Sequence, residues 1–170
     1  MSSSPALVPR KPSESEIIMT ELVIPNDSNI LGNVLGGRVM HWIDLAAATA
    51  AHRHCGAICV TASIEGMSFL HPIKVGQLAL LRARIVYVGR TSLVVKVIIH
   101  SEDMDTGERQ KTTEAYLAFV CLGKDGRPRQ VPALKLETQE EREEFGKAES
   151  IHKRRLEMIR SKSPRGQEIK

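Results

Sequence analysis

An aspartate within an alanine-rich segment is the first residue in this chain whose surroundings suggest chemistry. Asp44 follows Trp42 and Ile43 and precedes a run of alanines. Burying a carboxylate among apolar groups is costly unless it is paired or hydrogen-bonded, and carboxylates held in such surroundings are candidate bases or nucleophiles. The alternative interpretation is that Asp44 faces solvent or pairs with Arg38 or His41.

A polar loop precedes this segment, with the sequence PNDSNILGNVLGG over residues 25–37. Gly36 and Gly37 lie where a helix is expected to begin, and unpaired backbone N–H groups there could hold a developing oxyanion. Asn29, in the same loop, could orient a water molecule or a carbonyl group. Each of these residues could instead serve only a turn, so the loop alone leaves both interpretations open.

A second loop, over residues 89–92, combines a glycine, a cation and two hydroxyls. Gly89 exposes backbone, and Arg90, Thr91 and Ser92 follow it. These groups suit a phosphate or an amide-rich chain. An ordinary hairpin turn is the alternative.

His52, His54, Cys55 and Cys59 have a spacing that resembles that of metal ligands. No second cluster of cysteine and histidine completes a zinc site, so we expect no metal. The sequence also lacks a nucleophile-elbow motif, a phosphate-loop signature and a dinucleotide fingerprint. We therefore expect no cofactor.

The elements that must position these residues follow from the hydrophobic pattern. Residues 36–54 predict a helix because they are rich in alanine and contain no proline. At 3.6 residues per turn, one stripe of this helix carries Val39, Ile43, Ala46, Ala47 and Ala50, with Asp44 at its edge.

Strands are expected over 17–24, 58–68, 77–88, 92–99 and 111–122. Short turns join the last three strands, which are therefore expected to be antiparallel neighbours. In the segment 77–88, Arg82 and Arg84 should lie on one face and Leu81, Ala83 and Ile85 on the other. Thr138 and Glu141 form a capping-box pattern that predicts a terminal helix. This order of elements indicates an α+β fold with one buried helix. We divide the chain into a disordered tail (1–15), one domain (16–134), and a C-terminal helix with a basic tail (135–170).

Composition restricts the class of protein. Hydrophobic residues make up 42% of the chain, aromatic residues 4%, and the net charge is +4. No segment reaches the length of a membrane span or of a signal peptide, and the three cysteines are expected to be free thiols in a reducing compartment. We expect a cytoplasmic protein without a membrane partner. Few aromatics and no recognised module argue against nucleic-acid binding.

Taken together, several segments resemble the acyl-CoA hydrolases of the hotdog fold, especially the bacterial YciA-like enzymes and the cytosolic long-chain acyl-CoA hydrolases. They are residues 25–32, Gly36-Gly37, residues 40–44, 60–63 and 67–69, Pro72 to Gly76, and residues 89–92. The resemblance covers about residues 17–134. It implies a curved antiparallel sheet around one long central helix, with an extra C-terminal helix beyond that unit. It also implies a homo-oligomer, at least a dimer and commonly a trimer of dimers.

The resemblance implies a thioesterase site at the dimer interface, where the asparagine of one subunit faces the aspartate of the other. Asn29 and Asp44 match those two positions, and Gly37 would supply the oxyanion donor. Asp44 would act as general base on a water, or as nucleophile. Contacts to the acyl-CoA substrate would come from Gly36, Thr61, Ser63, Ser68, Phe69, Arg90, Thr91 and Ser92.

Two other functions of the same fold remain as alternatives. A hydratase or dehydratase would need a histidine paired with an acidic residue, and no histidine occupies the Asn29 loop. A non-catalytic acyl-CoA-binding protein could lose the carboxylate, whereas this chain keeps both Asn29 and Asp44.

Overall fold

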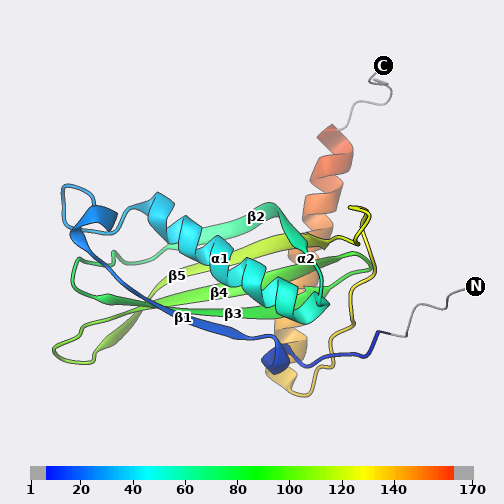
Figure 1. Cartoon of the computed structure of the whole chain (residues 1–170), viewed down its shortest axis with the longest axis horizontal. Helices are drawn as coiled ribbons and strands as arrows, with labels where there is room; N and C mark the ends of the chain where they lie inside the picture. The colour runs from blue at the N-terminus through cyan, green and yellow to red at the C-terminus, as the bar shows by residue number, and fades with distance from the viewer. Residues whose placement is uncertain (1–6, 163–170) are drawn as a thin grey trace, which may run out of the picture.

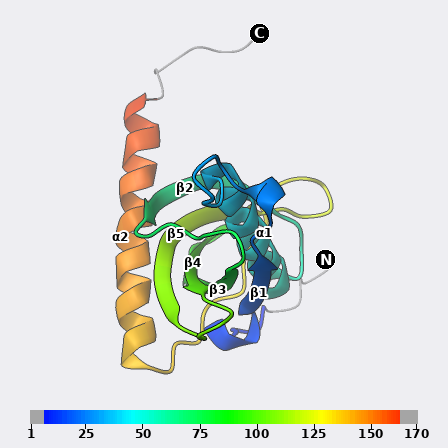
Figure 2. The same ribbon diagram turned by 90° about the vertical axis from the view of Figure 1, so that its left-hand side faces the viewer.

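A five-stranded antiparallel sheet curls around one long helix in the computed structural model, which describes residues 7–162. The strands lie in the order β1-β3-β4-β5-β2. Helix α1 lies inside the curve of the sheet, and helix α2 crosses its outer face (Figures 1 and 2). The elements are β1 (Ile17–Leu22), α1 (Gly36–Cys55), β2 (Cys59–Phe69), β3 (Leu78–Val88), β4 (Ser92–Glu102), β5 (Arg109–Cys121) and α2 (Gln139–Lys162), with short 3-10 turns at Pro12–Glu14 and Pro25–Asp27. The predicted α+β hotdog architecture is confirmed.

Helix α1 buries the predicted stripe. Ile43, Ala47 and Ala50 are completely buried, and the small alanine side chains let the sheet approach the helix closely. At the end of the helix, Gly56 adopts a left-handed conformation (φ 60°), and its N–H donates to the His52 carbonyl at 2.8 Å. Glycine suits this position because a Cβ would be strained there.

The central strands are covered on both sides, by α1 on the inner face and by α2 on part of the outer face (Figure 2). On β3, Leu81, Ala83 and Ile85 face α1 while Arg82 and Arg84 face outward, as predicted. On β4, the inward residues belong to the core around α1, whereas Val94 packs with Ala118 and with Ala148 of α2. Two covered faces explain the nearly continuous apolar run of residues 93–99.

Strand β2 occupies an edge of the sheet. It pairs with β5 alone, and the segment 70–77 carries the chain across to β3 on the other side. Register shifts interrupt the β2–β5 ladder between Thr61 and Ser63 and between Ile64 and Gly66. The other side of β2 therefore presents unpaired backbone groups at the sheet edge.

Helix α2 begins with the predicted capping box. The Glu141 N–H donates to the Thr138 hydroxyl at 3.1 Å, and the Glu141 carboxylate accepts from the Thr138 N–H at 3.2 Å. The helix starts beside β3, where Arg84 pairs with Glu141, and reaches β2, where Arg155 pairs with Glu65 at 2.9 Å. Its far end extends past β2 (Figure 2). No helix among residues 7–162 is long and apolar enough to cross a membrane.

The prediction of a disordered N-terminal tail is wrong for residues 10–15. Arg10 forms a parallel bridge with Leu134, with backbone bonds of 2.9 Å to Ala133 and Lys135. Pro12 is buried, and Ser15 is fully buried beside the His54 ring. The polar sequence of this segment gave no sign of its pairing with residues more than a hundred positions away. Residues 1–6 of the predicted tail lie outside the described residues.

Candidate functional site

Asp44 is held on the exposed side of α1 by one hydrogen bond from the sheet. The Thr61 hydroxyl of β2 donates to the Asp44 Oδ1 atom at 2.7 Å. The alternative pairing with Arg38 does not occur, because the Arg38 guanidinium contacts Asp27 at 2.6 Å. Asp44 and Thr61 are both exposed in the single chain. The carboxylate is therefore oriented by β2 and open to a ligand.

The beginning of α1 offers free backbone donors. The N–H groups of Arg38 and Val39 bond to the Leu35 carbonyl at 2.9 and 3.1 Å, whereas those of Gly36 and Gly37 have no backbone partner within the described residues. Both glycines are exposed, and no atom lies within 4 Å of the place that a Gly37 Cβ would occupy. A carbonyl oxygen can reach this helix terminus, where the helix dipole favours negative charge.

Asn29 serves its own loop with one end of its amide and leaves the other end available. Its Oδ1 atom accepts from the N–H groups of Leu31 and Asn33 at 2.9 and 3.2 Å. The amide oxygen is thereby fixed, and the side-chain NH₂ remains as two donors on an exposed residue. The turn role and the proposed ligand role are compatible.

One cavity brings together Asn29, Gly36 and Phe69 from three parts of the fold. The Phe69 ring lies 3.8 Å from the place that a Gly36 Cβ would occupy, so these two residues are neighbours in the wall of the cavity. Sequence reasoning did not select the lining residues His71 and Thr113. His71 lies in the loop after β2, and Thr113 continues the buried alternation of Ala115 and Leu117 on β5, which is the pattern of an ordinary core residue. Asp44 and Thr61 do not line this cavity. Within one chain, the asparagine and the aspartate thus belong to separate groups.

The predicted CoA-binding loop divides between two faces. Arg90 and Thr91 line a surface pocket with Pro128 and Gln130. The Gly89 N–H donates to the Ser92 carbonyl at 2.8 Å, which closes the β3–β4 hairpin. The Ser92 hydroxyl instead lies 3.4 Å from the His152 Nε2 atom of α2. The structure therefore does not group Ser92 with Arg90 and Thr91.

A β-bulge removes Ser63 from the Asp44 side of β2. Regular alternation would put Thr61 and Ser63 on the same face. The register shift between them adds one residue, so Thr61 lies opposite Phe119 of the inner core and Ser63 opposite Ala118 of the outer cluster. The Ser63 hydroxyl accordingly bonds to the Glu65 carboxylate, which pairs with α2. The bulge thus places Ser63 on the α2 side of the strand, and its contact with the substrate stays a prediction. Ser68 is exposed near the end of β2.

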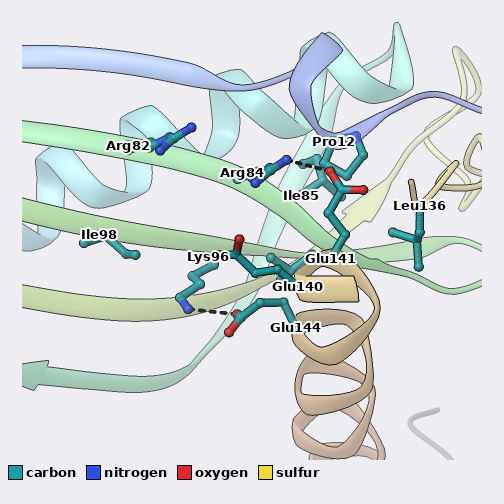
Figure 3. Close-up of a pocket in the computed structure, with 11 residues that line it drawn as sticks. Pro12, Arg82, Arg84, Ile85, Lys96, Ile98, Leu136, Glu140, Glu141 and Glu144 are labelled. Carbon is teal, nitrogen blue, oxygen red and sulfur yellow. Dashed lines mark hydrogen bonds and ion pairs between the residues drawn. The ribbon is translucent and has the colours of Figure 1, made fainter. Parts of the chain in front are cut away.

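A pocket beneath the start of α2 holds none of the predicted site residues (Figure 3). Four of its charged groups form two pairs: Arg84 with Glu141, and Lys96 with Glu144 at 2.8 Å. Burial acts to raise the pKa of Glu144, but Lys96 and Lys147 outweigh it and lower that pKa. These ion pairs hold α2 on the sheet.

Residues 31–108 match the family model of the thioesterase superfamily. The chain is 38% identical over 128 residues to the uncharacterised acyl-CoA thioester hydrolase YkhA of Bacillus subtilis, covering 75% of this chain and 74% of that protein.

Solved structures agree in fold over most of the chain. A hexameric acyl-CoA thioesterase without ligand is 35% identical, with a TM-score of 0.85, over 89% of this chain and 98% of that one. The acyl-CoA hydrolase of Staphylococcus aureus, solved with butyryl-CoA, CoA and CoA disulfide, is also 35% identical, with a TM-score of 0.83 over 91% and 95% of the two chains. That hydrolase has also been solved as single alanine variants of an aspartate, a threonine and an asparagine.

Proposed function

We propose that this chain, which belongs to the thioesterase superfamily and is an acyl-CoA thioester hydrolase of the hotdog fold, completes its active site only when two copies pair. In this proposal Asp44 of one protomer faces Asn29 and Gly37 of the other. The thioester of an acyl-CoA lies between them and is hydrolysed to a carboxylic acid and CoA.

One observation carries this proposal: the two polar groups are both exposed, but they do not share a cavity within one chain. Asp44 is bonded to the edge strand β2, while Asn29 lines a separate pocket at the start of α1. Edge strands pair readily with a second copy. Pairing of β2 with the partner's β2 would extend the sheet and could bring the two groups together across the interface.

The chemistry follows from the donors and acceptors. Asp44, oriented by the Thr61 hydroxyl, accepts a proton from a water as that water attacks the thioester carbonyl carbon. The alternative is direct attack by Asp44. The Gly37 N–H and the Asn29 NH₂ donate to the carbonyl oxygen as negative charge develops on it. The carbon–sulfur bond then breaks, and CoA leaves as a thiolate, a fair leaving group because an ordinary thiol has a pKa of about 8.5.

Arg90 and Thr91 are proposed to hold the phosphate-bearing part of CoA. Their pocket is open, and Arg90 is an exposed cation suited to phosphate oxygens. Gly36, Thr61, Ser68 and Phe69 remain proposed contacts nearer the thioester. The reaction needs no cofactor, since CoA enters with the substrate and leaves as product.

The assembly is proposed to be a trimer of dimers. A similar thioesterase is hexameric, and the exposed apolar side chains of Val60 and Ile64 on β2 support at least a dimer. The three free thiols are typical of a reducing compartment, which supports a cytoplasmic location.

A subunit-mixing experiment tests the shared site. Asp44→Ala and Asn29→Ala should each abolish CoA release, measured with a chromogenic disulfide, in proteins that remain folded. Unfolding and refolding an equal mixture should restore about a quarter of the wild-type activity, because half of the dimers would be mixed and one of their two sites intact. Full activity of a folded Asp44→Ala protein, or no recovery in a mixture that contains mixed dimers, would contradict the proposal.

A further inference from the structure

The three cysteines of the chain converge at one point outside the proposed active site. Cys55 is the last residue of α1, Cys59 the first of β2 and Cys121 the last of β5. Their sulfur atoms all lie within 4.8 Å of one another. Cys55 and Cys121 are buried, Cys59 is half-buried, and all three are free thiols.

Backbone geometry brings these thiols together. Cys59 and Cys121 are opposite each other in the β2–β5 ladder. The Leu122 N–H donates to the Ile58 carbonyl at 2.8 Å, so Ile58 and Leu122, the neighbouring pair, are the hydrogen-bonded one. Cys59 and Cys121 are thus a non-hydrogen-bonded pair, whose side chains lie closer together. The left-handed turn at Gly56 brings Cys55 beside them.

The groups around the cluster lower the pKa of its half-buried member, Cys59. A hydrogen bond from the Cys55 thiol lowers the pKa of Cys59, and it outweighs the opposing effect of burial with the help of Cys121 and the positive charge of Arg129. The same interaction with Cys59 raises the pKa of Cys55. The cluster thus combines one thiol whose pKa is lowered with two thiols whose pKa is raised.

We propose that Cys55, Cys59 and Cys121 form a binding site for a soft cation, Cu(I), held by three sulfur atoms. Thiolate ligands select soft ions such as Cu(I) and zinc. Structural zinc sites need four ligands, and no fourth cysteine, histidine or carboxylate joins this group within residues 7–162.

The neighbouring histidine is engaged elsewhere. The two ring nitrogens of His54 lie 3.4 Å from the Ser15 hydroxyl and 2.9 Å from the Pro132 carbonyl. His54 is next to Cys55 in the sequence, but its ring nitrogens contact these other groups and do not join the sulfur cluster. A disulfide would use only two of the three sulfurs, so it does not account for the convergence of all three.

The geometry needs only a small adjustment. Three sulfurs at about 2.3 Å from one metal ion, the usual zinc–sulfur distance, lie about 4 Å apart. Binding would release the thiol protons of the three cysteines to solvent, since coordinating thiols are deprotonated. Arg129 offsets part of the resulting negative charge. Copper enters and remains as Cu(I), so no electron is transferred.

Anaerobic titration of the reduced, full-length protein with Cu(I), in competition with a chromophoric Cu(I) chelator, tests the site. We expect one Cu(I) per chain and three sulfur neighbours by X-ray absorption. Cys59→Ser should weaken binding at least tenfold, as should Cys121→Ala. His52→Ala removes an exposed histidine at ligand-like spacing and should leave the affinity unchanged.

Because Cys59 is only half-buried, Cys59→Ser is the variant that should disturb the fold least. Circular dichroism would check that it remains folded. A copper ion with two sulfur neighbours would overturn the proposal. So would unchanged affinity in Cys59→Ser, no copper retained against the chelator, or binding of Zn(II) in preference to Cu(I).

Discussion

At the residue scale, the candidate site depends on single hydrogen bonds that orient exposed groups. The Asp44 carboxylate is fixed by Thr61, and the Asn29 amide by two N–H groups of its own loop. An exposed carboxylate that could rotate freely would present its lone pairs to the reacting water only part of the time. Orientation by a neighbour is a recurring requirement for a general base.

Removal of the Thr61 hydroxyl should therefore reduce the rate of the chemical step. Thr61→Val keeps the shape of the side chain but loses the bond to Asp44. We expect kcat to fall about 10- to 100-fold, the equivalent of a hydrogen bond to a charged group, with a smaller change in KM. Thr61→Ser should recover most of the rate, and the urea midpoint should change little because Thr61 is exposed. Equal loss in the serine and valine variants would argue against this role.

Arg90 belongs to binding rather than to chemistry in the proposed site. Arg90→Ala should raise KM for acyl-CoA more than it lowers kcat, because a contact to CoA is made in both the ground state and the transition state. Arg109→Ala is the matched control: this exposed arginine lies at the β4–β5 hairpin, at the other end of the sheet. A fall in kcat at constant KM in Arg90→Ala would move Arg90 into the catalytic group.

At the element scale, contacts between elements override local patterns. The bulge in β2 turns Ser63 to the outer face, and His54 at the end of α1 anchors the N-terminal segment through Ser15 and the loop through Pro132. Burial lowers the pKa of His54 below its ordinary value of 6.5, and the charge of Arg10 acts in the same direction. Burial likewise lowers the pKa of His152, and Arg155 contributes to the same shift.

These buried histidines predict a loss of stability in mild acid. Below pH 6.5 these histidines bind protons in the unfolded chain more readily than in the folded chain, because folding lowers their pKa. The free energy of unfolding should therefore fall as the pH is lowered toward 5. It should be fully regained above pH 6.5. His54→Gln cannot titrate but can still donate to Pro132, and it should show a shallower fall in thermal stability from pH 7.5 to 5. An unchanged slope in this variant would exclude His54 as a source of the effect.

At the scale of the whole molecule, both edges of the sheet carry exposed apolar side chains, with Ile18 and Leu22 on β1, but only the β2 edge is bonded to Asp44. Exposed apolar side chains of α1 and β2, including Leu45 and Ile64, surround the β2 edge close to Asp44. This edge also lies beside the far end of α2, which carries exposed Met158 and Ile159. The surface around β2 is therefore the one that we propose to pair.

A charge at this edge should separate the subunits and remove activity together. Ile64→Lys is expected to reduce the assembly size, measured by sedimentation, and to lower CoA release at least tenfold, because a lysine cannot be buried at low cost in an apolar interface. Ile18→Lys places the same charge on the exposed face of β1, at the opposite edge, and should preserve both properties. A monomeric Ile64→Lys protein with full activity would contradict a shared site.

Local pattern in the sequence determined the elements and the principal candidate residues. Alanine content and the absence of proline predicted α1, alternation predicted the two faces of β3, and Thr138 with Glu141 predicted the start of α2. Asn29, Gly37 and Asp44 were also found from the sequence, because the motifs that carry the resemblance are contiguous. Each of these signals lies within one element or in that element and the loop beside it.

Tertiary structure alone decided what depends on distant backbone. The pairing of Arg10 with Leu134, the opposite faces of Thr61 and Ser63, the contact of Ser92 with α2 and the convergence of Cys55, Cys59 and Cys121 have no local signature. An alternating pattern predicts the face of the sheet on which a side chain lies only while the strand pairing is regular. One inserted residue moves all the following side chains to the opposite face. Which segments meet is set by the register and packing of the whole sheet, which no short stretch of sequence contains.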